Sequence, residues 1–104
     1  MKVIDLDQKA EAATSLLKAL ASPIRLKILC SLVEGELAVG ALVERLGLRE
    51  SNVSQHLSLL RRDGLVATRR EGQTIHYRLE DPAALAVLEA LYKVYCAPPA
   101  RARR

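Results

Sequence analysis

The chain has 104 residues, a formal net charge of +4 and a hydrophobic content of 50%. This length allows one domain, and hydrophobic residues that are mainly Leu, Ala, Val and Ile, with no Trp or Phe, are typical of packed helices. No apolar run reaches the roughly 18 residues of a membrane span, and Asp5 and Asp7 interrupt the first turn. We therefore expect no membrane segment, no signal peptide and a cytoplasmic location.

Two helices are predicted at the start of the chain. Leu and Ala recur at helical spacing over residues 6–20, and Asp5 is the expected N-cap. Ser22 followed by Pro23 is a strong helix start, because Ser caps the first turn and Pro is suited to the first helical position. The second helix is expected to end near Val33.

Two shorter helices are predicted next, over residues 38–46 and 51–62. Gly47 is expected to end the first of them, and Ser51 is expected to cap the second. The second helix directs Val53, Leu57 and Leu60 inward. The tight glycine-containing linker between the two helices is typical of a helix-turn-helix unit.

The pattern then changes from helical to strand periodicity. Residues 65–70 and 74–79 alternate and are rich in β-branched side chains, and the Glu-Gly-Gln at 71–73 between them predicts a hairpin turn. Asp81 and the proline after it predict a last helix over 82–96. We therefore expect a single domain over residues 1–96 and a disordered basic tail over 97–104.

This order of elements predicts a winged helix-turn-helix fold, mainly α with a β-hairpin wing. In such a fold the helix over 51–62 lies in the major groove of DNA, and short or amide-bearing side chains read the base edges. The expected DNA contacts are Glu50, Ser51, Asn52, Ser54, Gln55 and His56 on the helix, Arg61 and Arg62 at its end, and Arg69, Arg70 and Gln73 on the hairpin. The alternative for the basic residues is a solvated face, and for the hairpin an ordinary exposed turn.

The helix over 82–96 is apolar on two faces. One face can pack on its own domain, and the other needs a partner. Together with the first helix, it is expected to form a two-fold homodimer interface that spaces two recognition helices by about 34 Å, one turn of DNA.

Three stretches carry a resemblance to a known family: LKALASPIRLKIL, SNVSQHLSLLRRDGLV and GQTIHYRL. Together they resemble the ArsR/SmtB family of bacterial repressors, and the resemblance covers about residues 12–96. It implies a winged-helix dimer on a palindromic double-stranded operator, which it leaves when an inducer binds. It also implies that Ser51, Ser54 and Gln55 contact bases, with Glu50 as a further candidate, whereas His56 is as well suited to orienting the helix.

The metal sites of that family are not expected here. At the positions of its thiolate site, which usually reads Glu-Leu-Cys-Val-Cys, this chain has Glu36-Leu37-Ala38-Val39-Gly40 and so lacks both thiols. The last helix has Glu89, preceded by Asp81, but no histidine. We therefore expect no metal and no cofactor.

Cys30 and Cys96 remain as candidate sensor residues. Their surroundings, RLKILCSLVEGE and LYKVYC, resemble the sulfide- and persulfide-sensing branch of the family. That resemblance implies that reactive sulfur species bridge the two thiols within one subunit. Because a helix C-terminus disfavours an anion, we expect Cys30 rather than Cys96 to attack first. The alternative is that Cys30 is a buried small hydrophobic residue.

Other functions remain open at this point. They are a metal-sensing repressor with an unrecognised site, a repressor switched by peroxide through a disulfide, and a dimeric interaction module that does not bind DNA. The sequence contains no nucleophile–base constellation or glycine-rich phosphate loop, so we do not expect an enzyme.

Overall fold

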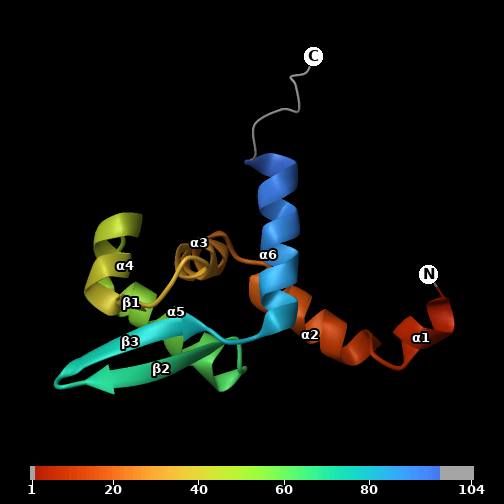
Figure 1. Cartoon of the computed structure of the whole chain (residues 1–104), viewed down its shortest axis with the longest axis horizontal. Helices are drawn as coiled ribbons and strands as arrows, with labels where there is room; N and C mark the ends of the chain where they lie inside the picture. The colour runs from red at the N-terminus through yellow and green to blue at the C-terminus, as the bar shows by residue number, and fades with distance from the viewer. Residues whose placement is uncertain (1, 97–104) are drawn as a thin grey trace, which may run out of the picture.

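The computed structural model describes residues 2–96, which form six helices and a three-stranded antiparallel sheet (Figure 1). The elements are α1 (Val3–Asp7), α2 (Ala10–Leu20), α3 (Pro23–Leu32), β1 (Leu37–Ala38), α4 (Val39–Leu46), α5 (Glu50–Arg62), β2 (Val66–Glu71), β3 (Thr74–Leu79) and α6 (Pro82–Tyr95). The expected fold, mainly helical with a β-hairpin, is confirmed. The tail expected over residues 97–104 lies outside the described residues.

Two of the expected helix caps are present. The Ser22 hydroxyl accepts a hydrogen bond from the backbone N–H of Arg25 at 3.3 Å, and α3 begins directly after it. The Asp81 carboxylate accepts one from the N–H of Ala83 at 2.8 Å at the start of α6. In both helices the side-chain oxygen satisfies a backbone donor of the first turn that lacks a partner within the helix.

The other two expected N-caps, Asp5 and Ser51, are wrong. Residues 6–20 do not form one helix: α1 ends at Asp7 and α2 begins at Ala10, so Asp5 lies inside α1 instead of capping a helix. Val3 is 69% exposed and Leu6 48% exposed, so little packing holds this part of the chain in one continuous helix.

Ser51 is likewise inside α5, which begins at Glu50 with Arg49 as its N-cap. The N–H of Val53 already bonds the carbonyl of Arg49 at 3.1 Å, which closes the first turn ahead of Ser51. Glu50 in that turn is favourable at the positive end of the helix dipole.

The two-residue strand β1 was not expected. Leu37 lies opposite Tyr77 and Ala38 opposite His76, so the strand order is β1-β3-β2. A helix was expected from residue 38, but Ala38 is extended and α4 begins at Val39. Two residues carry no periodicity of their own, and β3 alone gives them their strand conformation.

One hydrophobic core joins α3, α4, α5 and α6. Its fully buried large side chains are Ile28, Leu29, Leu42, Val53, Leu57, Leu60 and Leu88. Because α5 contributes three of these residues from one face, its opposite face is turned to solvent.

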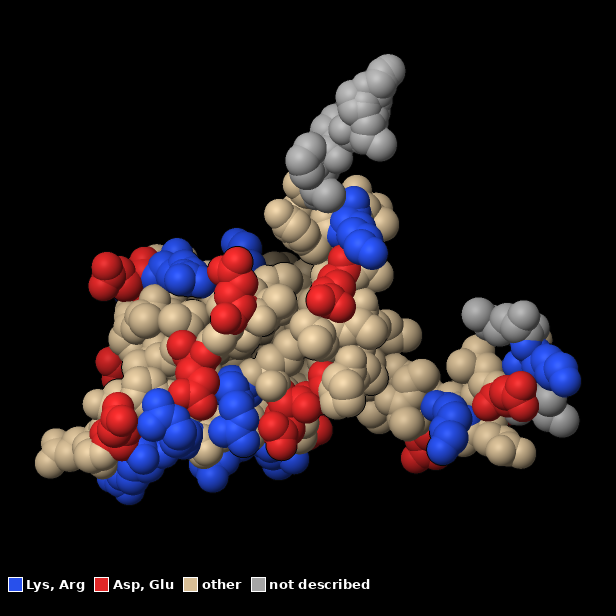
Figure 2. Space-filling model, viewed as in Figure 1, with Lys and Arg blue, Asp and Glu red and all other residues tan. Residues whose placement is uncertain are grey.

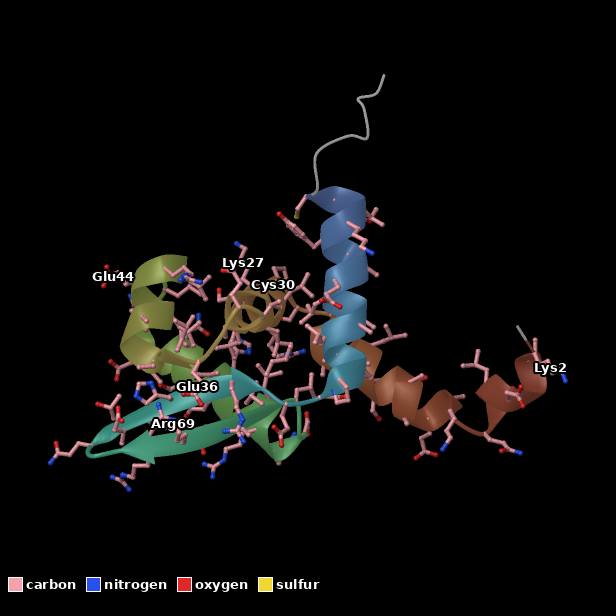
Figure 3. The ribbon with its side chains drawn as sticks, in the orientation of Figure 1. Lys2, Lys27, Cys30, Glu36, Glu44 and Arg69 are labelled. Carbon is pink, nitrogen blue, oxygen red and sulfur yellow. The ribbon has the colours of Figure 1, made fainter. Side chains whose placement is uncertain are left out.

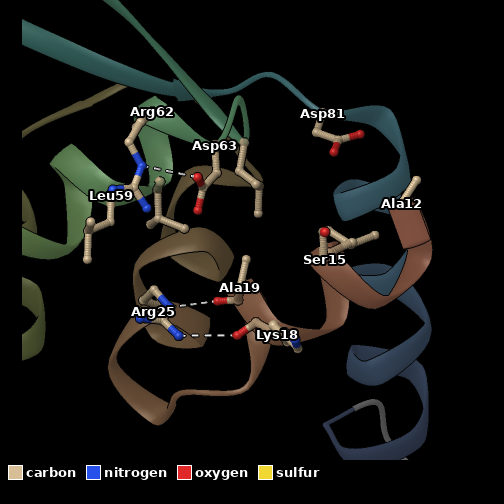
Figure 4. Close-up of a pocket in the computed structure, with 12 residues that line it drawn as sticks. Ala12, Ser15, Lys18, Ala19, Arg25, Leu59, Arg62, Asp63 and Asp81 are labelled. Atoms are coloured by element: carbon tan, nitrogen blue, oxygen red, sulfur yellow. Dashed lines mark hydrogen bonds and ion pairs between the residues drawn. The ribbon is translucent and has the colours of Figure 1, made fainter. Parts of the chain in front are cut away.

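The α2 helix is tied to α3 by Arg25. The Nε of Arg25 donates to the carbonyl of Ala19 at 2.7 Å, and a terminal nitrogen donates to that of Lys18 at 3.2 Å (Figure 4). These bonds satisfy carbonyls at the end of α2. A hollow of about 580 Å³ lies beside this contact, between α2, the end of α5 and Asp81.

Figure 1 shows α1 and the outer part of α2 extending away from the other helices, while α6 stands upright with its last turns beyond the core. No helix among residues 2–96 has the length and apolar character needed to cross a membrane.

Candidate nucleic-acid interface and thiol pair

The helices α4 and α5 form the helix-turn-helix. Gly47 ends α4 with φ of 66°, a left-handed conformation that glycine adopts without strain, and its N–H bonds the carbonyl of Val43 at 2.9 Å. Only Leu48 and Arg49 then separate it from α5. Leu48 packs against the core and helps to set the angle between the two helices.

The polar face of α5 is available to a ligand. Glu50, Ser51 and Gln55 are exposed, and Asn52 and Ser54 are half-buried. Within residues 2–96, the side chains of these five residues make no hydrogen bond to the protein. The hydrogen-bond donors and acceptors of these side chains are therefore positioned by a helix whose opposite face is buried in the core, and they are not used within the fold.

His56 differs from its neighbours on α5. Its side chain is half-buried, and its Nδ1 atom is buried with no hydrogen-bond partner among the described residues. This ring nitrogen points toward the protein, so the structure does not group His56 with the exposed residues of the helix.

Basic side chains lie at the end of α5 and on the hairpin. Arg61 and Arg62 are exposed in the last turn, and Arg62 lies 3.4 Å from the carboxylate of Asp63. Figure 2 shows Lys and Arg side chains gathered along the edge of the molecule that the hairpin forms (lower left), with acidic side chains among them.

The tip of the hairpin carries Arg70 and Gln73, both exposed. The Nε of Arg70 donates to the carbonyl of Gly72 at 3.1 Å, and Gly72 has φ of 63° in the turn. These two residues lie at the tip, as expected, and their remaining polar atoms face solvent.

Arg69 is engaged within the protein. Its Nε donates to Oε1 of Glu36 at 3.0 Å, and Glu71 lies 3.5 Å from its guanidinium (Figure 3). Glu36, which was not expected to matter, lies just before β1 and also lies 4.0 Å from Arg78. The sequence contained no signal for this cluster, because it depends on β1 pairing with β3.

The cluster shifts the pKa of both partners. The hydrogen bond from Arg69 is the largest effect and lowers the pKa of Glu36. Desolvation, the second-largest effect, raises it, and the charges of Arg69, His76 and Arg78 lower it again, so that the net shift is downward. The pKa of Arg69 is raised, first by the same hydrogen bond. The carboxylate and the guanidinium therefore both stay charged at neutral pH.

The two thiols share one cavity. Cys30 lies in the last turns of α3, Cys96 follows the last residue of α6, and both are free and exposed. They line a cavity of about 790 Å³ between these helices. Cys30 is therefore not the fully buried residue of the alternative interpretation.

The expected order of reaction at the thiols is not supported. Burial raises the pKa of the Cys30 thiol, and the nearby Cys96 raises it further. A raised pKa reduces the thiolate fraction at neutral pH, whereas a first attacker needs thiolate character. The helix dipole alone does not decide the order, because Cys30, although exposed, is partly desolvated beside the cavity that it shares with Cys96.

No metal centre is assembled in the described part of the chain: residues 2–96 contain no group of three or more His, Cys, Asp or Glu side chains positioned to hold an ion.

A helix-turn-helix whose second helix has a free polar face, followed at once by a β-hairpin, defines a winged-helix transcriptional regulator. The family described as "Bacterial regulatory protein, arsR family" matches residues 22–68. The chain belongs to the ArsR family of transcriptional regulators, whose relatives found here are DNA-binding proteins and not enzymes.

The similarity to individual relatives extends over nearly the whole chain. The transcriptional activator HlyU of Vibrio cholerae is 47% identical over 96 residues, which are 92% of this chain and 89% of that protein. The biofilm growth-associated repressor of Xylella fastidiosa strain 9a5c is 42% identical over 93 residues, 89% of this chain and 82% of that protein. The crystal structure of the repressor BigR from Xylella fastidiosa superposes with a TM-score of 0.89 at 41% identity, covering 94% of this chain and 100% of the other.

Proposed function

We propose that this protein is a homodimeric repressor that binds a palindromic operator through α5 and the hairpin, and releases it when reactive sulfur species bridge Cys30 and Cys96. The observation that carries the sensing part is the single cavity lined by both thiols. Because a regulator of this kind works where the chromosome is, the cytoplasmic location expected from the sequence belongs to the same proposal.

The face of α5 supports operator reading. Ser51, Ser54 and Gln55 present hydroxyl and amide groups that match base edges in the major groove, where Gln pairs with adenine through two hydrogen bonds. Arg61 and Arg62 at the other end of the helix are placed to contact phosphates, which position a protein without selecting a sequence.

Arg70 and Gln73 at the hairpin tip are candidates for the adjacent groove or backbone. Arg69 is a weaker candidate than the sequence alone indicated, since DNA has to compete with Glu36 for its guanidinium. His56 is assigned to orienting α5, because its buried Nδ1 faces the protein.

Exposed apolar side chains on the outer helices support a homodimer. Leu17 on α2 is 58% exposed, and Val94 on α6 is 74% exposed. Side chains of this kind are normally covered in a soluble regulator, and a second copy supplies a matching surface by two-fold symmetry. The dimer then places two α5 helices about one DNA turn apart, as a palindrome requires.

In this proposal an organic persulfide, RSSH, supplies the sulfur of the bridge. Each protein thiolate takes the outer sulfur of one RSSH molecule, which leaves as the thiol RSH. The outer sulfur of the Cys30 persulfide then attacks the inner sulfur, Sγ, of the Cys96 persulfide and expels the outer sulfur of that group as hydrosulfide, which leaves a three-sulfur bridge. The inserted sulfur spans more than a direct disulfide, which requires Cα atoms within about 7 Å.

Packing within the fold connects the bridge to the DNA-binding surface. The bridge would draw the end of α3 toward the end of α6. The α3 helix packs directly against α4 and α5 of the helix-turn-helix, so a displacement of α3 changes the angle at which α5 is presented.

The test compares an organic persulfide with diamide on the purified protein, read by intact mass and by mobility shift on its own promoter. Persulfide should add one sulfur and remove two hydrogens within one chain and release the DNA, whereas diamide gives at most a disulfide. The Cys96→Ser variant should bind DNA normally and no longer respond.

Four outcomes contradict the proposal. Persulfide release that persists in Cys96→Ser rejects the bridge, and release by diamide alone favours a disulfide switch. Release by zinc, cadmium or arsenite favours a metal sensor. Absent or salt-insensitive promoter binding rejects the repressor.

A further inference from the structure

The cavity between α3 and α6 has an apolar interior. Its walls include Leu26 and Val33 from the α3 side and Leu88 and Leu91 from α6, with two tyrosines near Cys96. Its volume of about 790 Å³ lies within the usual range of small-molecule sites. Two thiols that needed only to react with each other would not need a space of this size.

We propose that this cavity is a binding site for an uncharged, apolar polysulfide, in its simplest form a dialkyl trisulfide, which it presents to Cys30 and Cys96. The inference rests on the proposed function and specifies the chemical class of its inducer.

The charges of the lining favour an uncharged ligand. Glu34, Glu89 and Lys93 are its charged residues, so acidic groups outnumber basic ones. A ligand such as a glutathione conjugate carries carboxylates, which these glutamates repel and which apolar walls cannot solvate. Alkyl groups, by contrast, gain free energy for each methylene that the walls remove from water.

Prior binding also compensates for the weak nucleophile. Burial raises the pKa of Cys30, so only a small fraction is thiolate at neutral pH. A ligand held next to the thiol raises the effective concentration of the electrophile, and this offsets the small thiolate fraction.

The reaction balances without a further oxidant. One of the two protein thiolates attacks the central sulfur of RSSSR, the bond from that sulfur to one outer sulfur breaks, and RS⁻ leaves. The thiolate of the other cysteine then attacks the same central sulfur, and the second RS⁻ leaves. The product is a Cys30–S–S–S–Cys96 bridge and two alkyl thiolates, so the trisulfide is itself the oxidant.

The test uses two reagents that share the same three-sulfur unit: dipropyl trisulfide, which is uncharged, and glutathione trisulfide, which is charged. Bridge formation in the full-length protein is followed by intact mass, and each rate is divided by that of the same reagent with N-acetylcysteine. The normalised preference for the dipropyl reagent should be about tenfold or more, as expected from burial of its methylenes.

Two variants separate the cavity from the rest of the surface. Val33 and Ile75 are both 38% exposed, but Val33 lines the cavity whereas Ile75 lies on the hairpin. Val33→Glu should abolish the preference, and Ile75→Glu should keep it. A preference that survives Val33→Glu overturns the inference.

A second measurement does not depend on the thiols. The chain has two cysteines, so the Cys30→Ser, Cys96→Ser double variant cannot react, and ligand-observed NMR measures reversible binding of dipropyl trisulfide to it. Saturable binding that Val33→Glu removes is the expected result.

The outcomes distinguish the two proposals. Equal normalised rates with both reagents overturn this inference and leave the thiol switch in place. No bridge with either reagent also overturns this inference, whereas the thiol switch is decided by the separate test with an organic persulfide.

Discussion

Arg69 on β2 and Glu36 ahead of β1 form an ion pair with a nitrogen–oxygen distance of 2.9 Å, across the intervening strand β3. The hydrogen bond from Arg69 Nε reaches the same carboxylate oxygen. Glu36 is the last residue of the segment that connects α3, the helix that carries Cys30, to β1. The pair therefore joins the hairpin to the chain segment that follows α3.

Glu36→Gln should destabilise the protein at neutral pH, and the effect should fade in acid. The pKa of Glu36 is lowered in the folded state, so its carboxylate stabilises the fold above the ordinary Glu pKa, and this contribution is lost as the pH falls through the lower folded value. Urea unfolding of the wild-type protein and of Glu36→Gln, at about pH 7 and at about pH 3, measures the difference in their free energies of unfolding.

The matched control is Glu44→Gln. Glu44 is exposed on α4 and makes no ion pair within residues 2–96, and Figure 3 shows it on the outer side of α4. The Glu44→Gln substitution should leave the urea unfolding midpoint unchanged at both pH values. An equal loss in the two variants would show that the ion pair has no special role.

Gln55→Ala should reduce discrimination between operator and random DNA by about 1–3 kcal/mol, because it removes a side chain suited to bidentate contact with adenine. Competition mobility shifts with both DNAs give the ratio. Arg61→Ala is the comparison: it should weaken binding to both DNAs alike and reduce the salt slope by about one. Unchanged discrimination in Gln55→Ala would remove Gln55 from the base-reading set.

Leu57→Ala should lower the free energy of unfolding by about 2–5 kcal/mol, since it leaves a cavity beneath α5. Leu57 is 0% exposed, whereas Leu59 on the same helix is 39% exposed. Leu59→Ala makes the same chemical change and should cost less than about 1 kcal/mol. Chemical denaturation of the two variants checks the contrast, and similar losses would contradict the assigned inner face of α5.

Cys30 should titrate at higher pH in the folded protein than in the unfolded chain. Its pKa is raised first by burial and second by Cys96, so the shift should shrink but persist in Cys96→Ser. The pH dependence of iodoacetamide alkylation of that variant, with and without urea, measures the shift. A folded midpoint at or below the unfolded one would show that burial is not the dominant cause.

The local elements of this protein follow from the sequence. Ser22 and Asp81 cap their helices with side-chain oxygens a few residues from the backbone donors that they satisfy. The spacing of Val53, Leu57 and Leu60 defines the inner face of α5, because a helix repeats every 3.6 residues whatever surrounds it. The polar face of α5 follows from the same periodicity, which is why the candidate DNA-reading residues could be named in advance.

Other features required the tertiary structure. The break between α1 and α2 reflects the lack of packing partners for that part of the chain. Strand β1 and the ion pair between Glu36 and Arg69 depend on neighbours that are distant in sequence. A family resemblance had paired Cys30 with Cys96, but only the fold places α3 and α6 on either side of one apolar cavity and raises the pKa of Cys30. Burial and long-range charge are properties of the assembled fold, so no pattern along the chain carries them.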